Sequence, residues 1–150
     1  MITVTAPFSE KIIRSEMDRF RKTLEPGEPV KLIIPDGVKE IGNISFYHFT
    51  DLKELVVPGS VKRISSSAFN ECWNLEKVTL SYGIEAIDDE AFGNCFNLKT
   101  LKVPSSIRCI SPHAFNNNME TLYLPLRSTA FYDGSHVDLF TPLRVSYYEP

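Results

Sequence analysis

Apolar and polar positions repeat every 23 residues through the middle of the chain. The aligned apolar positions are, row by row, Leu32, Leu55, Val78 and Leu101; Ile34, Val57, Leu80 and Val103; Val38, Val61, Ile84 and Ile107; Ile41, Ile64, Ile87 and Ile110; and Phe46, Phe69, Phe92 and Phe115. A period of this length is typical of solenoids, in which each unit buries its apolar positions only against its neighbours. The pattern therefore predicts about four stacked 23-residue units over residues 30–125.

Each unit contains two extended pieces and a turn. Alternating apolar residues predict short strands, with one face buried, at residues 55–57, 78–80, 101–103 and 122–124. A second extended piece ends before Ser65, Asp88 or Ser111. These residue types favour the N-cap position, so we expect one helical or 3₁₀ turn to follow each of them.

The two ends of the chain depart from the repeat. Residues 8–25 predict an amphipathic helix that begins after Ser9 and buries a stripe made of Ile13, Met17, Phe20 and Leu24. Residues 126–150 predict one or two strands around a turn at Asp133–Gly134. Because the open ends of a solenoid need covering, we expect a single domain over 1–150, with an N-terminal helical cap at 1–29 and a C-terminal strand cap at 126–150.

The repeated pattern resembles a known family. Residues 52–72 read Leu-x-x-Leu-x-Val-Pro-x-x-Val-x-x-Ile-x-x-x-Ala-Phe-x-x-Cys, which is similar to the BspA-type (Treponema-like) leucine-rich repeat of bacterial surface and secreted proteins. The resemblance covers about residues 30–125. It implies a right-handed α/β repeat solenoid with a strand-lined concave side, and a role in adhesion or protein recognition. It supplies no catalytic residue. Phe49 departs from the pattern, because it stands where the next unit has Cys72.

Composition narrows the choice of partners. The 150 residues carry a net charge of −3, so a nucleic-acid partner is unlikely and a protein partner is favoured. No apolar run approaches the roughly 20 residues of a membrane helix, so we expect no membrane insertion. The chain shows no secretory signal. We expect a monomer that is cytoplasmic if the chain is full length, and at the cell surface or secreted if it is a trimmed fragment.

Candidate catalytic chemistry is sparse. Cys72 and Cys95 share one row of the repeat and are interpreted as buried packing residues. Cys109 and His113 could form a Cys–His pair, as in a hydrolase, but no third residue to orient them is evident. The acids at residues 88–90 suit the first turn of a helix better than a cation site. We therefore predict no enzyme, no cofactor and no metal.

The binding prediction rests on the outward positions of the strands. One outward row and its neighbours hold the candidate partner-binding residues, which are Ile33, Val56, Thr79, Lys102, Tyr123, Lys77 and Tyr82. Trp73 and Phe96 stand one repeat apart, and they either anchor a partner or pack on a neighbouring loop. We expect a macromolecule-binding module for protein–protein recognition or adhesion. The alternative is an intracellular inhibitor, for example one of phage origin, that blocks a target protein by surface contact.

Overall fold

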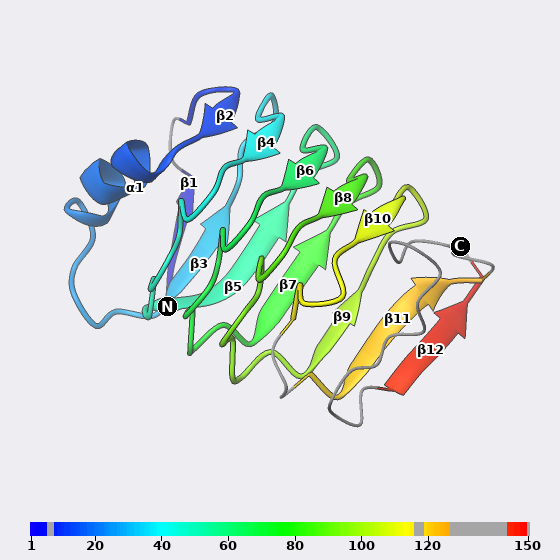
Figure 1. Cartoon of the computed structure of the whole chain (residues 1–150). Coiled ribbons are helices and arrows are strands. Elements are labelled where there is room, and N and C mark those ends of the chain that lie inside the picture. Colours follow the sequence, from blue (N-terminus) through cyan, green and yellow to red (C-terminus); the bar gives the residue numbers. More distant parts are fainter. Residues whose placement is uncertain (6–7, 116–118, 127–143, 150) are drawn as a thin grey trace.

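The chain winds as a parallel β-solenoid in which each coil contributes one longer and one short strand (Figure 1). The computed structural model describes residues 1–5, 8–115, 119–126 and 144–149. The longer strands are β1 (Ile2–Thr5), β3 (Val30–Ile33), β5 (Leu52–Val57), β7 (Lys77–Leu80), β9 (Thr100–Lys102), β11 (Thr121–Pro125) and β12 (Arg144–Tyr148). The short strands are β2 (Lys11–Ile12), β4 (Glu40–Ile41), β6 (Arg63–Ile64), β8 (Ala86–Ile87) and β10 (Cys109–Ile110), and the helix is α1 (Arg14–Arg21). The predicted stack of about four 23-residue units is confirmed.

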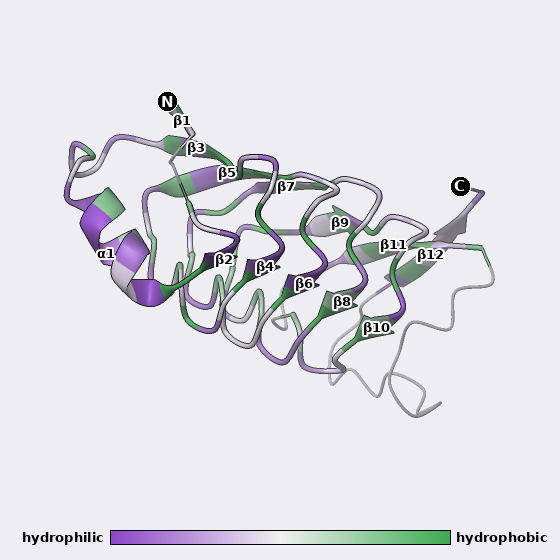
Figure 2. Ribbon diagram, turned by 90° about the horizontal axis from the view of Figure 1, so that it is seen from above, coloured by the Kyte–Doolittle hydropathy of each residue, from purple (hydrophilic) through white to green (hydrophobic). Residues whose placement is uncertain are grey.

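Residues 23 positions apart face each other across neighbouring coils. Leu55 pairs with Leu32 on one side and with Val78 on the other, and Ile64 pairs with Ile87 in the short strands. The two sets of strands lie on opposite sides of the coils (Figure 2), and the residues of the apolar rows belong to the hydrophobic core. Because each coil leaves its apolar side chains against the next, the core is one continuous cluster along the stack.

Four phenylalanine rings form a column inside this core. The centroid spacing grows along the stack, from 4.8 Å for Phe46–Phe69 to 5.4 Å for Phe69–Phe92 and 6.0 Å for Phe92–Phe115. Beside the column, the buried Cys72 thiol donates to the Phe46 carbonyl at 3.3 Å. Cys95 repeats this bond one coil later. The prediction that these two cysteines are packing residues is confirmed, and both are free thiols.

The turn expected after the second strand is a single i→i+3 hydrogen bond, as from Ala68 N to the Ser65 carbonyl at 3.1 Å, and it does not continue as a helix in the described coils. The segment consists of consecutive turns, with left-handed backbone at Ser67 and Glu71 (φ 53° and 62°) and at the equivalent positions of other coils. A left-handed residue interrupts helical hydrogen bonding, and the freed amides bond to the next coil, as from Phe69 N to the Ala91 carbonyl at 2.8 Å. The Ser65 hydroxyl bonds to the Glu40 carboxylate instead of capping a helix.

The N-terminal helix is shorter than predicted, and two strands precede it. β1 and β2 extend both sheets by a further partial coil, and α1 begins only at Arg14. Ser9 is therefore not the N-cap; Ile13 takes that place, and its side chain is exposed. Gly42 makes room for β2, because a Cβ atom there would lie 2.5 Å from the Ile12 carbonyl. The alternation of apolar and polar residues at 2–5 is the signal for β1 that the sequence analysis missed.

An element from each end segment contacts the outermost coil beside it. Met17 of α1 is buried against the first coil. Arg14 donates to the carbonyls of Ile44 and Tyr47, each at 3.1 Å, which ties the helix to the turns of that coil. At the other end β12 pairs in parallel with β11. The turn expected at Asp133–Gly134 lies outside the described residues. In the described part, no helix has the length and apolar character that would let it cross a membrane.

Candidate functional site: a cleft in the strand-lined face

The outward side chains of the longer strands form a row that is interrupted between β7 and β9. Ile33 pairs with Val56 and Val56 with Thr79, whereas Lys102 pairs with Tyr123 in the second group. All five are partly or fully exposed. The structure thus places the predicted outward row on one face, which we call the strand-lined face.

The interruption is a division of the sheet. The longer strands form two hydrogen-bonded groups, β1-β3-β5-β7 and β9-β11-β12, and no ladder joins β7 to β9, both of which are fully described. The short strands form one unbroken sheet of five. The same pair of coils shows the widest spacing in the phenylalanine column, 6.0 Å between Phe92 and Phe115. At this pair of coils the long strands therefore lack their ladder, while the short strands β8 and β10 remain paired.

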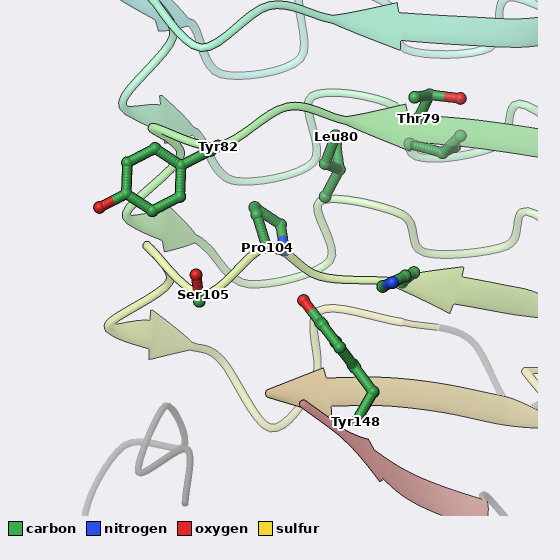
Figure 3. Close-up of a pocket in the computed structure, with 8 residues that line it drawn as sticks. Thr79, Leu80, Tyr82, Pro104, Ser105 and Tyr148 are labelled. Atoms are coloured by element: carbon green, nitrogen blue, oxygen red, sulfur yellow. The ribbon is translucent and has the colours of Figure 1, made fainter. Parts of the chain in front are cut away.

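A cleft of about 450 Å³ occupies this division (Figure 3). It is lined by Val78, Thr79, Leu80, Tyr82, Lys102, Pro104, Ser105 and Tyr148. Val78 and Leu80 are half-buried here, although the equivalent residues of the coils on either side are fully buried. Part of the apolar core is therefore accessible from the strand-lined face.

Tyr148 forms one wall of the cleft although it belongs to the last strand. Its side chain lies across β11 (Figure 3), and its hydroxyl donates to the Val103 carbonyl at 2.5 Å. In an earlier coil the equivalent carbonyl, that of Val57, accepts from the backbone amide of Ser81 at 3.0 Å. Pro125 occupies the Ser81 position here and has no amide hydrogen. The tyrosine hydroxyl thus supplies the donor that proline removes.

Among the described residues that line the cleft, Lys102 alone carries a formal charge. Its Nζ lies 4.0 Å from the centroid of the Tyr148 ring, a cation–π contact. Lysines elsewhere on the long strands pair with acids of the next coil, as Lys31 does with Glu54 at 3.3 Å. Within the described residues Lys102 has no such ion pair. Burial raises the pKa of Tyr148, so its hydroxyl stays protonated and remains a donor.

The cleft gathers three of the nine predicted binding residues: Thr79, Tyr82 and Lys102. Lys77 lies on the same strand as Thr79 but on the next row, outside the lining. Ile33, Val56 and Tyr123 lie on the strand-lined face beyond the cleft.

Trp73 and Phe96 lie in the turns before β7 and β9, with 42% and 45% of their surfaces exposed. Trp73 stands edge-on to His48 of the preceding coil, with the ring centroids 4.8 Å apart. His48 in turn lies 3.2 Å from the Glu71 carboxylate. Trp73 therefore packs on a neighbouring turn while a large part of its ring stays accessible.

Cys109 does not have the environment of a nucleophile. It lies half-buried on β10, and burial, followed by the charge of Asp88, raises the pKa of its thiol. This direction disfavours the thiolate that a nucleophilic cysteine requires. Asp88 itself is engaged by Arg63, with Nη1–Oδ distances of 2.7 and 2.8 Å. Within the described ranges, no three His, Cys, Asp or Glu side chains are grouped as metal ligands would be.

Comparisons with known proteins agree with this architecture. A family model described as BspA type leucine rich repeat region (6 copies) matches residues 28–136. A leucine rich cell surface protein from Faecalibacterium prausnitzii is 27% identical, with a TM-score of 0.70 over 82% of this chain and 33% of that protein. A leucine rich repeat protein from T. pallidum is 26% identical, with a TM-score of 0.60 over 70% of this chain and 52% of that protein.

The chain thus spans about a third and about half of these two proteins. A search of curated proteins finds no match. Because the family model covers most of the chain and the coils have the expected parallel register, this chain belongs to the BspA-type leucine-rich repeat family.

Proposed function

We propose that the chain is a recognition module that binds a partner protein through its strand-lined face. The observation that carries the proposal is the cleft in the middle of an otherwise continuous outward row. Hollows that expose apolar surface beside a few polar groups are the usual form of binding sites. Leucine-rich repeat proteins are in general protein-binding or adhesion modules, and this supports the same use here.

Aromatic side chains flank the cleft as anchors of an interface do. Tyr82 is 75% exposed at one rim, and Tyr123 is 38% exposed on the strand beyond Lys102. Tyrosine is enriched among the residues that dominate interface energies, since it offers a large rigid surface and a polar tip. Two such residues beside an apolar hollow favour a partner that inserts a side chain between them.

The dimensions of the face indicate how the partner must lie. Seven longer strands at a spacing of about 4.8 Å give a face roughly 30 Å across, and four residues of strand are about 13 Å long. The flat area of about 400 Å² is smaller than the roughly 800 Å² that each partner buries in a stable interface. A partner must therefore also cover the loops at the ends of the strands, where Tyr82 lies. One structural neighbour is named a cell surface protein, and we extend the proposal to adhesion outside the cell.

Site-specific photocrosslinking tests the choice of face. A photoreactive phenylalanine analogue is placed at Thr79 in one variant and at Trp73 in a second, and each is exposed to lysate and surface extract of the source organism. We expect a discrete protein adduct from the Thr79 variant. The partner identified in this way is then produced recombinantly, and it should bind the Tyr123→Ala variant at least tenfold more weakly than it binds the native protein. Adducts from the Trp73 variant alone would place the interface on the turns and overturn the proposal.

A further inference from the structure

The cleft combines an apolar floor with a single cation, and this combination defines what it can hold. We propose that it binds a segment of the partner protein in which a carboxylate side chain stands next to an apolar one. The inference rests on the proposed function to the extent that the segment belongs to the partner. The proposed function states which face binds the partner, and the inference adds which chemical groups of the partner enter the cleft.

The apolar requirement follows from what the division of the sheet exposes. Val78 and Leu80 belong to the rows that are otherwise buried throughout the stack, and Pro104 adds a third apolar surface. Covering such surface removes apolar area from water, which is favourable in proportion to the area covered. An occupant made only of polar groups would instead have to give up its own water without this gain.

The acidic requirement follows from Lys102. Its ammonium is held against the Tyr148 ring at 4.0 Å, and the described residues of the lining include no carboxylate to neutralise it. A ring contacts the ammonium on one side, so its other donors remain directed to solvent and to the cleft. A carboxylate beside the apolar group of the occupant would supply charge-assisted hydrogen bonds at this position.

The strands around the cleft carry the same sign of charge. β7, β9, β11 and β12 contain Lys77, Lys102 and Arg144, and none of the four strands contains Asp or Glu. By contrast, Lys31 and Glu54 alternate in the first half of the face and pair with each other. The four strands themselves therefore carry positive charge only, although Glu76, Glu120 and Glu149 stand next to their ends. This field favours an acidic segment lying across the strands.

A protein segment fits the position of the cleft better than an isolated ligand does. The cleft opens in the middle of the outward row, between Thr79 and Lys102, and Val56 and Tyr123 continue the row on either side. A partner that covers the face must pass over the opening. Its segment can insert the apolar side chain at Leu80 while the neighbouring carboxylate meets Lys102.

Blocked tripeptides test the pairing of the two requirements by titration with amide ¹H–¹⁵N NMR. The probes are acetyl-leucine-aspartate-leucine amide, the matched leucine-asparagine-leucine peptide, and glycine-aspartate-glycine as the acid without apolar neighbours. A methyl glucoside serves as a carbohydrate probe. We expect the first peptide to shift the amides of Thr79, Leu80 and Lys102 with a Kd in the millimolar range, and at least fivefold more tightly than either of the other two peptides.

Variants assign the preference to the charge in the cleft. Lys102→Met keeps the aliphatic stem, and should make the aspartate and asparagine peptides bind equally. Lys39→Met removes an exposed lysine that lies just before β4, away from the strand-lined face, and should leave the preference unchanged. Equal binding of the two peptides to the native protein, a preference that survives Lys102→Met, absence of saturable shifts, or saturable shifts with the glucoside alone would each overturn the inference. Peptide binding without any photocrosslinked partner would instead count against the proposed function and leave the inference standing.

Discussion

Truncation of Phe92 tests whether the stack is held by its aromatic column. Phe92 is buried between Phe69 at 5.4 Å and Phe115 at 6.0 Å. Replacing a buried phenylalanine by alanine costs about 3–5 kcal/mol, with the larger values where the cavity cannot collapse. Collapse is opposed here because backbone bonds hold this position to both neighbours, from Phe69 N to the Ala91 carbonyl and from Phe92 N to the Ala114 carbonyl, each at 2.8 Å. We therefore expect a loss in the upper half of that range.

The assay is equilibrium unfolding in urea, followed by circular dichroism, with the free energy of unfolding extrapolated to water. Phe92→Leu is the matched control, because it keeps most of the volume and should cost less than about 1.5 kcal/mol. It also keeps the measurement possible if Phe92→Ala consumes the whole stability, which is about 5–15 kcal/mol for a typical domain. A loss below about 1 kcal/mol for Phe92→Ala would show that the column does not hold the coils together, and the reasoning would fail.

Four further predictions concern the caps, the thiols and the binding face. Deleting residues 1–25 removes β1, β2 and α1 and exposes the edge of β3, so we expect aggregation by light scattering, whereas a folded monomer would show that these elements are an appendage. With the pKa of Cys72 raised to about 12 by burial, only about one thiol in 10⁴ is ionised at pH 8, and iodoacetamide should leave Cys72 unlabelled until the protein unfolds. The hydrogen bond from Lys11 lowers the pKa of Glu40 in the folded protein. Ionised Glu40 therefore stabilises the fold at pH values above its pKa in the unfolded chain, and this contribution is lost as the pH falls through its pKa in the folded protein; Lys11→Met should raise the folded-state pKa in an NMR titration. Tyr123→Ala and Lys102→Glu should each weaken binding of the partner at least tenfold without lowering the melting temperature, and unchanged affinity would exclude the strand-lined face.

The repeat made most of the fold predictable. The rows that end at Ile110 and Phe115 are buried in register as the period required. The turns were harder, because their structure depends on bonds between coils. Ser65 has the identity of an N-cap, yet it bonds across to Glu40, and left-handed Ser67 follows it. Hydrogen bonds from these amides to the next coil override the local preference for a helix. Such bonds cannot be foreseen from the sequence of one unit alone.

The N-terminal cap was misread because two patterns compete there. Met17 and Phe20 of α1 and Leu24 beyond it pack against the core, whereas Ile13, the fourth residue of the predicted stripe, is exposed. The residues before them, however, gain more by extending the two sheets, since β1 and β2 satisfy the open strand edges of the first coil. Gly42 was the available signal. It breaks a row otherwise held by Ser65, Asp88 and Ser111, and the absent side chain marks where β2 approaches.

The candidate site could be predicted only in part. The period placed Thr79 and Lys102 in one row, but it also implied that their strands pair like all the others. In the structure β7 and β9 do not pair, and nothing in the residues 77–80 and 100–102 marks that division. Tyr148 was equally out of reach, because its place in the cleft depends on β12 returning beside β11 after a segment without the repeat.

The C-terminal strand therefore has two roles: it covers the edge of the stack, and it forms part of the cleft. β12 covers the outer edge of β11, and Tyr148 also reaches back over β11 to the Val103 carbonyl and to Lys102. The wall of the cleft and its cation are thus fixed by a residue from the end of the chain, whereas Val78 and Leu80 come from the repeats. A repeat unit supplies the apolar rows that every coil shares. Specificity in such a stack comes from the places where the repetition fails, and here these are the division between β7 and β9 and the strand that closes the stack.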